Sequence, residues 1–369
     1  MSDESVLFET RPTSNGRQLG VITLNAEKSL NALSLPMAEA IYDQLMAWEE
    51  HAEIACIVMQ AAGDKAFCAG GDIVALYQAI NEGAASSYIE TFFELEYRLD
   101  YLIHTYTKPI LCWGHGIVMG GGLGLMAGAS HRVVTEKSRI AMPEISIGLY
   151  PDVGGSWFLN RMPGRVGLYL GLTGASLNAA DALYVKLADH YVEHVEQAAL
   201  FEDLLKLDWA DDYHQNHGKL SKLLRGHRGK YPLPESPVRQ HFDFINAVTD
   251  YDSVEEIAAA LANHQLDDAW IQRGTQALLK GSPSSAKVIF EIHRRAMHMS
   301  LEEVFAMELG LSIQFCLHPD LREGVRALLI DKDNAPKWSP PTLGEVSAAY
   351  VEEHFLPPWP QDKHPFKAW

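Results

Sequence analysis

Strand-like apolar runs alternate with helical segments over about the first 180 residues of this 369-residue chain. The runs occupy residues 19–26, 54–61, 109–119 and 131–136. Between the first two, apolar residues recur every three or four positions from Met37 to Trp48, which is the spacing of a helix with one buried face. Strands that alternate with helices are typical of a layered α/β core. We therefore predict an α/β fold.

Two serines mark places where helices are expected to begin. Ser34 is a suitable N-cap, and Pro36 fits the first helical turn that follows it. Ser300 and Glu303 have the spacing of a capping box, in which each side chain bonds the backbone N–H of the other. The sequence thus predicts helices after residues 34 and 300.

The composition of the chain changes after about residue 200. Residues 201–290 are more polar and are predicted to be helical, and the tail after Pro336 is rich in proline and tryptophan. We expect a core at 1–200, a helical insert at 201–290, and C-terminal helices with an extended tail at 291–369 that cover the core.

Composition excludes several classes of protein. Hydrophobic residues make up 47% and charged residues 21%, as in soluble globular proteins, and the net charge of −18 disfavours nucleic-acid binding, which needs a basic surface. The four cysteines lack metal-site spacing, so we expect them to be reduced and buried. Neither a secretory pattern nor a membrane-length apolar run is visible. These features predict a cytoplasmic protein without nucleic-acid or membrane partners.

Two glycine loops follow apolar strands, FCAGGD at 67–72 and GIVMGGGLG at 116–124. Glycine lets a ligand approach the main chain, and a loop at the start of a helix presents unpaired N–H groups. Two such loops can supply two convergent donors for an oxyanion that develops on a carbonyl. Taken alone, each loop is better explained by close packing of a strand on a helix.

The second loop also fits a dinucleotide fingerprint at Gly122, Gly124 and Ala127, with Glu144 about 20 residues further on. That fingerprint normally lies in the first βα unit, whereas here it follows the third strand. Nicotinamide binding is therefore not expected.

Two carboxylates lie eight residues apart in MPEISIGLYPDVGG, at Glu144 and Asp152, each directly after a proline. Such a pair can act as general acid and base, or as a nucleophile with a helper. Burial beside another acid would raise the pKa of one of them. The alternatives are an N-cap role for Asp152, at a helix beginning near Val153, and a loop hydrogen bond for Glu144.

Other polar residues have simpler explanations. His115 is expected to be a satisfied or exposed histidine, and Ser156 lies in GGSWF rather than in a serine-hydrolase motif. A short basic run is either a solvated loop or a docking point for a ligand phosphate. Its members are Lys219, Lys222, Arg225, Arg228 and Lys230.

Four ordered motifs resemble the enoyl-CoA hydratase/isomerase (crotonase) superfamily. They are NALS at 31–34, KAFCAGGD at 65–72, MGGG at 119–122 and AMPEISIGLYPDVGGSWFL at 141–159. The resemblance implies a spiral of ββα units with a C-terminal helical region, and an acyl-CoA thioester as substrate. It implies that the N–H groups of Gly71 and Gly121 hold the thioester oxygen, and that Lys65 and Ala69 contact CoA. It implies no metal or separate cofactor, since CoA is part of the substrate, and it allows a homo-oligomer.

Later strings resemble the branch of this superfamily that hydrolyses 3-hydroxyisobutyryl-CoA in valine breakdown. These strings are SPSSAKV at 282–288 and EGVRALLIDKDNAPKW at 323–338. Gly124 stands where hydratases of the superfamily carry a glutamate, so water addition by two glutamates is not expected.

The branch implies roles for three carboxylates in the hydrolysis of a 3-hydroxyacyl-CoA. Glu144 attacks the thioester or activates water, Asp152 positions the substrate hydroxyl or water and moves a proton, and Glu96 contacts the substrate. The neighbouring Glu94 is an alternative for that contact. An enoyl-CoA isomerase or hydratase, or a catalytically silent CoA-binding protein, are the alternative functions.

Overall fold

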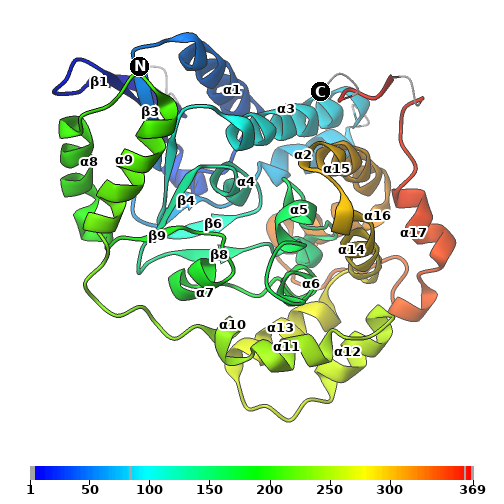
Figure 1. Ribbon diagram of the computed structural model, residues 1–369. Coiled ribbons are helices and arrows are strands. Elements are labelled where there is room, and N and C mark those ends of the chain that lie inside the picture. The colour runs from blue at the N-terminus through cyan, green and yellow to red at the C-terminus, as the bar shows by residue number, and fades with distance from the viewer. Residues whose placement is uncertain (1–4, 83–84, 361–362, 367–369) are drawn as a thin grey trace. The chain divides into compact units, whose positions relative to one another are not determined.

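The computed structural model describes residues 5–82, 85–360 and 363–366, and the chain divides into two compact units (Figure 1). The first unit consists of Met1–Gly71, Arg98–Ile140 and Leu177–Ser236. The second unit consists of Asp72–Tyr97, Ala141–Ser176 and Pro237–Trp369. Both units are therefore built from segments that are far apart in the sequence.

Within the described residues, the first unit carries a six-stranded sheet in the order β1-β2-β3-β5-β7-β9. Its strands are β1 (Val6–Pro12), β2 (Gln18–Leu24), β3 (Ile54–Ala61), β5 (Ile110–Gly114), β7 (His131–Val134) and β9 (His190–Tyr191). β1 and β2 form an antiparallel hairpin, and the remaining neighbours are parallel. Parallel strands need crossover connections, which agrees with the alternation of strands and helices in the sequence. The predicted α/β class is confirmed.

The described residues also form a smaller sheet, whose strands lie in the order β4 (Ala66–Cys68), β6 (Ile117–Met119) and β8 (Arg139–Ala141). The single run predicted at 109–119 is thus two strands in two sheets. The reason is the bend at His115 and Gly116, where Gly116 has φ +60° and a side chain would clash with the Lys65 carbonyl.

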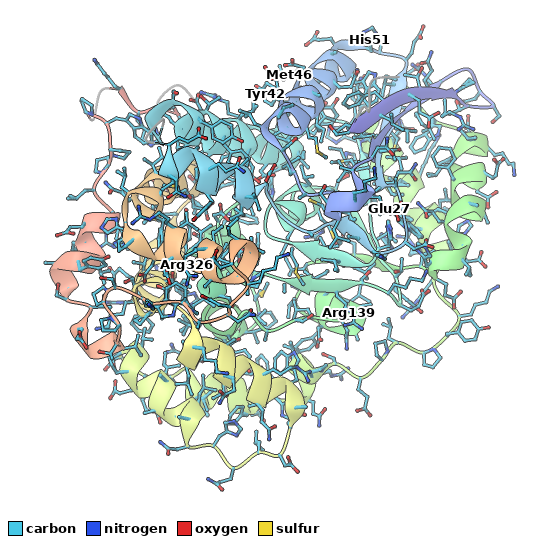
Figure 2. All side chains as sticks on the ribbon, turned by 180° about the vertical axis from the view of Figure 1, so that it is seen from behind. Glu27, Tyr42, Met46, His51, Arg139 and Arg326 are labelled. Carbon is cyan, nitrogen blue, oxygen red and sulfur yellow. The ribbon has the colours of Figure 1, made fainter. Side chains whose placement is uncertain are left out.

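The helix α1 (Leu35–Glu50) begins at Ser34, whose side chain accepts a 3.4 Å hydrogen bond from the Met37 N–H, as predicted. Its buried side contains Met37, Ala38, Ile41, Leu45 and Trp48. Figure 2 shows Tyr42 and Met46 on the outer part of this helix and His51 directly after its end, and Met46 is 43% exposed. The predicted periodicity therefore describes its buried face correctly.

The other helices of the first unit are α4 (Gly121–Ala127), α7 (Ala179–Tyr184), α8 (Gln197–Lys206) and α9 (Tyr213–Gly226). α8 and α9 lie side by side (Figure 1), and their leucines pack on the large sheet. Leu200, Leu204, Leu220 and Leu224 join Trp113 of β5 in one buried cluster. The sequence predicted 201–290 as one helical insert, and the structure divides this stretch between the two units at Ser236.

The second unit is mainly helical. It contains α2 (Ile73–Asn81), α5 (Gly155–Leu159), α6 (Val166–Thr173), α10 (Pro237–Gln240), α11 (Phe242–Val248), α12 (Val254–Ala262), α13 (Ala269–Lys280), α14 (Pro283–Arg295), α15 (Leu301–Leu317), α16 (Pro319–Val325) and α17 (Ala348–His354). The helix α3 (Ala85–Thr105) begins in this unit and continues into the first after Tyr97. α6 is buried on all sides and contacts α5, α11, α13 and α14, so it forms the centre of the unit.

Short helical turns connect these elements. They are η1 (Glu27–Ser29), η2 (Glu144–Ile147), η3 (His194–Glu196), η4 (Ala296–His298), η5 (Arg326–Ile330) and η6 (Leu343–Glu345), of which η5 is π-helical. Figure 2 labels Arg326, which begins η5. The capping box predicted at Ser300 and Glu303 is confirmed at the start of α15. The tail after Pro336 is not extended throughout, because Ser347 caps α17 by accepting from the Tyr350 N–H.

All four cysteines are buried, and the described residues contain no disulfide, as expected. In the part of the chain that the structure describes, no helix combines the length and the apolar character needed to cross a membrane. No cluster of three or more His, Cys, Asp or Glu side chains suited to a metal ion occurs among the described residues.

Candidate active site

The first glycine loop lies in the first unit, directly after β4. Ala69 donates a 3.1 Å hydrogen bond to the Leu30 carbonyl, and Leu33 donates a 2.8 Å bond to the Gly70 carbonyl. Gly71 faces Leu33 in an isolated parallel bridge. In this pattern Leu33 bonds the residues on either side of Gly71, so the Gly71 N–H points away from Leu33. That amide remains available for a ligand.

The second glycine loop, in the same unit, turns the chain into α4. Gly120 has φ 48° and ψ −127°, and Gly121 is the first residue of the helix. The N–H of a first helical residue has no partner within the helix and lies at the positive end of its dipole. The Gly121 amide can therefore stabilise a negative charge.

The two glycine loops pack against each other. A side chain at Gly122 would clash with the Cys68 carbonyl, and one at Gly70 would lie 3.6 Å from the Met119 carbonyl oxygen. Close packing, one of the two explanations open from the sequence, thus accounts for Gly122. It does not occupy the amides of Gly71 and Gly121, so the predicted donor role for these two glycines is compatible with the fold.

Glu144 lies in the second unit and begins η2 directly after Pro143. The turn is held from several sides: the Glu144 carbonyl accepts from the Leu149 N–H at 3.0 Å, and the Ile145 carbonyl accepts from the Ser282 N–H at 3.1 Å. The Glu144 side chain is buried, and its Oε2 has no hydrogen-bond partner among the described residues. A buried carboxylate oxygen without a partner is unusual for a purely structural residue.

Asp152, also in the second unit, is buried and bonded to a tyrosine. The Tyr97 hydroxyl donates a 2.7 Å hydrogen bond to Asp152 Oδ2, and Ser312 Oγ lies 2.6 Å from the same hydroxyl. The N-cap of α5 is Gly154, and no side chain caps that helix. The alternative in which Asp152 is a helix cap is therefore wrong.

Three carboxyl groups of the second unit perturb one another. Burial raises the pKa of Glu144 well above its usual range, and the Asp152 and Glu96 carboxylates raise it further. Burial also raises the pKa of Asp152, to about 6, although the hydrogen bond from Tyr97 opposes the rise. The pKa of Glu96 is raised by burial and by Asp152. Buried carboxyl groups whose pKa values are raised by one another are candidates for acid–base catalysis.

The structure distinguishes Glu96 from Glu94, the two candidates on α3 for the substrate contact. Glu96 is 2% exposed, and its Oε1 has no hydrogen-bond partner among the described residues. Glu94 is half-buried, whereas the Glu96 carboxylate is one of the groups that raise the pKa of Glu144. Of the two candidates, Glu96 is therefore the member of the acidic cluster.

Lys65 and Ala69, the residues assigned to CoA, flank β4. The Lys65 side chain is exposed, and its carbonyl accepts a 3.0 Å bond from the Ile117 N–H. Ala69 is half-buried in the first glycine loop. Gly124 is buried in α4 and contributes no carboxylate. The CoA contacts of Lys65 and Ala69 remain predictions.

Sequence reasoning missed the polar residues that surround Asp152. Tyr150 has its hydroxyl 2.8 Å from Ser312 Oγ and 2.9 Å from the Glu308 carbonyl oxygen, so it can donate to either. Glu308 is fully buried, and burial together with Asp152 raises its pKa to about 8. A signal was present, because Glu308 and Ser312 continue the apolar face that runs from Val304 at helical spacing.

The remaining candidate residues make contacts that are typical of a structural role. His115 is buried, its Nε2 lies 2.8 Å from the Gly63 carbonyl oxygen, and burial lowers its pKa. Lys219, Lys222 and Arg228 line an open groove of about 670 Å³ in the first unit. Carboxylates line the same groove, and Lys219 is paired with Asp208. Mixed charge of this kind favours a solvated surface over a docking point for phosphate. The predicted loop is wrong for Lys219, Lys222 and Arg225, because these residues lie in α9.

Comparison with known proteins agrees with this arrangement. The sequence profile of the family described as enoyl-CoA hydratase/isomerase matches residues 19–355. The chain is 42% identical over 340 residues to 3-hydroxyisobutyryl-CoA hydrolase, mitochondrial, of Danio rerio, which covers 91% of this chain and 86% of the relative. It is 39% identical over 357 residues to the Homo sapiens protein of that name, and this match covers 95% of this chain and 88% of that relative.

Solved structures show the same fold. A carnitinyl-CoA dehydratase from Mycobacterium thermoresistibile aligns with a TM-score of 0.86 at 35% identity, over 99% of this chain and all of that one. An enoyl-CoA hydratase from Rhodobacter sphaeroides 2.4.1 aligns with a TM-score of 0.83 at 32% identity, over 96% of this chain and 98% of that one. The predicted crotonase-like fold is thereby confirmed. This chain belongs to the enoyl-CoA hydratase/isomerase family, the crotonase superfamily.

Proposed function

We propose that this enzyme hydrolyses the thioester of a 3-hydroxyacyl-CoA, with 3-hydroxyisobutyryl-CoA as its substrate. The products are 3-hydroxyisobutyrate and CoA. Relatives that are about 40% identical over some 90% of the chain carry the name of this activity. Family membership itself supports an acyl-CoA substrate.

The observation that carries the proposal is that Glu144 is buried within the influence of a second buried carboxyl group, Asp152, which raises the pKa of Glu144 and accepts a hydrogen bond from Tyr97. An isomerase that moves a double bond needs only a single base, so Asp152 would have no role in that reaction. Addition of water by two glutamates requires a carboxylate where this chain has Gly124. Hydrolysis uses both Glu144 and Asp152.

In the proposed reaction, the amides of Gly71 and Gly121 donate hydrogen bonds to the thioester carbonyl oxygen. These donors stabilise the charge that develops there, and loss of one such donor typically slows a reaction by about 10²–10³. Lys65 and Ala69 are assigned to CoA, and Glu96 to the acyl group. Because the CoA thiolate is a good leaving group, placement and oxyanion stabilisation supply much of the catalysis.

Glu144 can serve the reaction by two routes. As a nucleophile, its carboxylate bonds the carbonyl carbon, the C–S bond breaks, and water then hydrolyses the resulting anhydride. As a general base, it removes a proton from water while the water oxygen bonds the same carbon, and the C–S bond then breaks. In both routes Asp152 passes a proton toward the departing thiolate, and a pKa near 6 suits a group that gains and loses protons.

A panel of acyl-CoA thioesters tests the proposal. Thiol release from a 3-hydroxyacyl-CoA, fastest with 3-hydroxyisobutyryl-CoA, is the expected result. A change in enoyl absorbance without thiol would indicate an isomerase, hydratase or dehydratase. Binding without either signal would indicate a catalytically silent CoA-binding protein. Isothermal titration with CoA separates this last outcome from an inactive preparation.

A further inference from the structure

The backbone that follows Asp152 in the second unit has an unusual conformation. Val153 has φ +52° and Gly154 has φ +82°. A left-handed conformation is ordinary for glycine but strained for a β-branched residue, because its branched side chain crowds the backbone. Val153 is also buried. Strain of this kind persists only where the surroundings hold the backbone in place.

Glu308 of α15 supplies that hold. Its Oε2 accepts a 2.7 Å hydrogen bond from the Gly154 N–H, and its Oε1 accepts a 2.9 Å bond from the Ser156 N–H. Both oxygens of one fully buried carboxyl group thus bond the bend that follows Asp152. Burying a carboxyl group is costly, and a hydrophobic residue would serve packing better, so this position calls for a specific role.

The same helix also reaches the side chain of Asp152. Ser312 lies one turn after Glu308, on the same face of α15. Its hydroxyl is 2.6 Å from that of Tyr97, which donates to Asp152. α15 therefore holds Asp152 at two points, the backbone after it through Glu308 and the carboxylate through Ser312 and Tyr97.

We propose that Glu308 is a positioning residue, which directs the Asp152 carboxyl group by fixing the bend from Val153 to Ser156. The proposal rests on the hydrolysis proposed above, in which Glu308 itself touches no reacting atom. It extends that function, because it names the group that sets the orientation of Asp152.

The substitution Glu308→Gln tests this role with little change in shape. The glutamine oxygen can accept one amide N–H, but its NH₂ group faces the other N–H, so the bend loses one of its two bonds. We expect kcat for thiol release to fall about 10- to 100-fold, as for a misplaced catalytic group. KM should stay within about threefold, because substrate binding is not the function that is lost. Glu302→Gln, on the exposed side of the same helix, is the matched control.

A double-mutant cycle with Asp152→Asn shows whether Glu308 acts through Asp152. If it does, Glu308→Gln costs little further activity once Asp152 has been replaced. If the losses of activity in the two single variants multiply in the double variant, Glu308 acts independently of Asp152 and the proposal is overturned. So would an unchanged kcat in Glu308→Gln.

Hydrogen exchange of the full chain gives a readout that does not need activity. In Glu308→Gln, the amides of residues 153–157 should exchange at least about tenfold faster, while those of α1 stay unchanged. Unchanged exchange at 153–157 overturns the proposal. If the wild type releases no thiol, the proposed function fails, and this measurement still decides whether Glu308 holds the bend.

If Glu308→Gln does not fold, Glu308→Asp takes its place. It keeps the carboxyl group but shortens the side chain by one methylene group, and it should show the same loss of kcat and the same faster exchange. Wild-type values for both in a folded Glu308→Asp protein would contradict the proposal.

Discussion

The hydroxyl of Tyr97 donates a 2.7 Å hydrogen bond to Oδ2 of Asp152, a residue 55 positions later in the chain. A hydrogen bond donated to a carboxylate stabilises its charged form and lowers its pKa. The bond therefore partly offsets burial, which raises the pKa of Asp152 to about 6. Tyr97 thus favours the ionised form of Asp152, against the effect of burial.

Replacing Tyr97 by phenylalanine removes this donor while keeping the ring. The pKa of Asp152 should rise, because only the ionised form gains from the bond. Because the proposed mechanism needs protonated Asp152 as the proton donor to the thiolate, the alkaline limb of the kcat/KM profile should move to higher pH. Measurement of thiol release between pH 5 and 9 checks this, with Tyr251→Phe, at an exposed tyrosine, as control. An alkaline limb at the wild-type position would show that Tyr97 does not tune Asp152.

Substitution of Glu144 by glutamine should abolish turnover while CoA still binds. The amide is close in shape but can neither attack the thioester nor accept a proton, so we expect a loss of at least about 10² in kcat. Thiol release measures the first effect and titration calorimetry the second. Unchanged thiol release would remove Glu144 from the mechanism.

Asp152→Asn should slow hydrolysis more than it weakens CoA binding. Asparagine keeps an oxygen for the Tyr97 hydroxyl but cannot carry a proton between water and thiolate. Comparison of kcat with the dissociation constant of CoA checks the ranking. The reverse ranking would indicate that Asp152 serves mainly to hold the fold.

The acidic cluster predicts how stability depends on pH. Folding raises the pKa of Glu308 to about 8, whereas burial lowers the pKa of His104, His131, His293 and His354 to about 4. Above about pH 7 these histidines are neutral in both states, so between about pH 7 and 8 Glu308 makes the folded state bind more protons than the unfolded state. The free energy of unfolding should therefore fall as the pH rises from about 7 to 8. Urea unfolding at a series of pH values measures this fall, and Glu308→Gln should reduce it. A curve that rises from pH 7 to 8 would contradict this prediction.

The close packing of the two glycine loops predicts a contrast between two glycines. Gly122→Ala places a methyl group against the Cys68 carbonyl and should destabilise the protein by about 1–3 kcal/mol. Gly218→Ala lies in α9, with nothing within 4 Å of the added carbon, and should be neutral or stabilise by up to about 1 kcal/mol. Chemical denaturation compares them. Equal effects would mean that the loops can separate without cost.

Local features were predictable from the sequence because their causes lie within a few residues. Ser34 and Ser300 cap helices as expected, since each cap needs only an N–H two or three positions further along. The glycine loops and the prolines before Glu144 and Asp152 marked the candidate site for the same reason. The resemblance to the superfamily added the roles of these residues.

Long-range relationships could not be predicted in this way. Glu308 bonds an amide 154 residues earlier in the chain, and nothing in its own neighbourhood indicates that partner. The break of the run at 109–119 into two strands depends on the close approach of Gly116 to the Lys65 carbonyl. The alternative role of Asp152 as a helix cap failed because its side chain accepts a hydrogen bond from Tyr97, and no side chain caps α5.

The order of segments along the chain has a consequence for biosynthesis. All parts of the first unit have left the ribosome once Ser236 has emerged, so its sheet can form during translation. The segments Asp72–Tyr97 and Ala141–Ser176 belong with residues that are made last. Until then their apolar side chains lack the partners that Pro237–Trp369 supplies, and apolar surface exposed during this interval makes a nascent chain prone to aggregation.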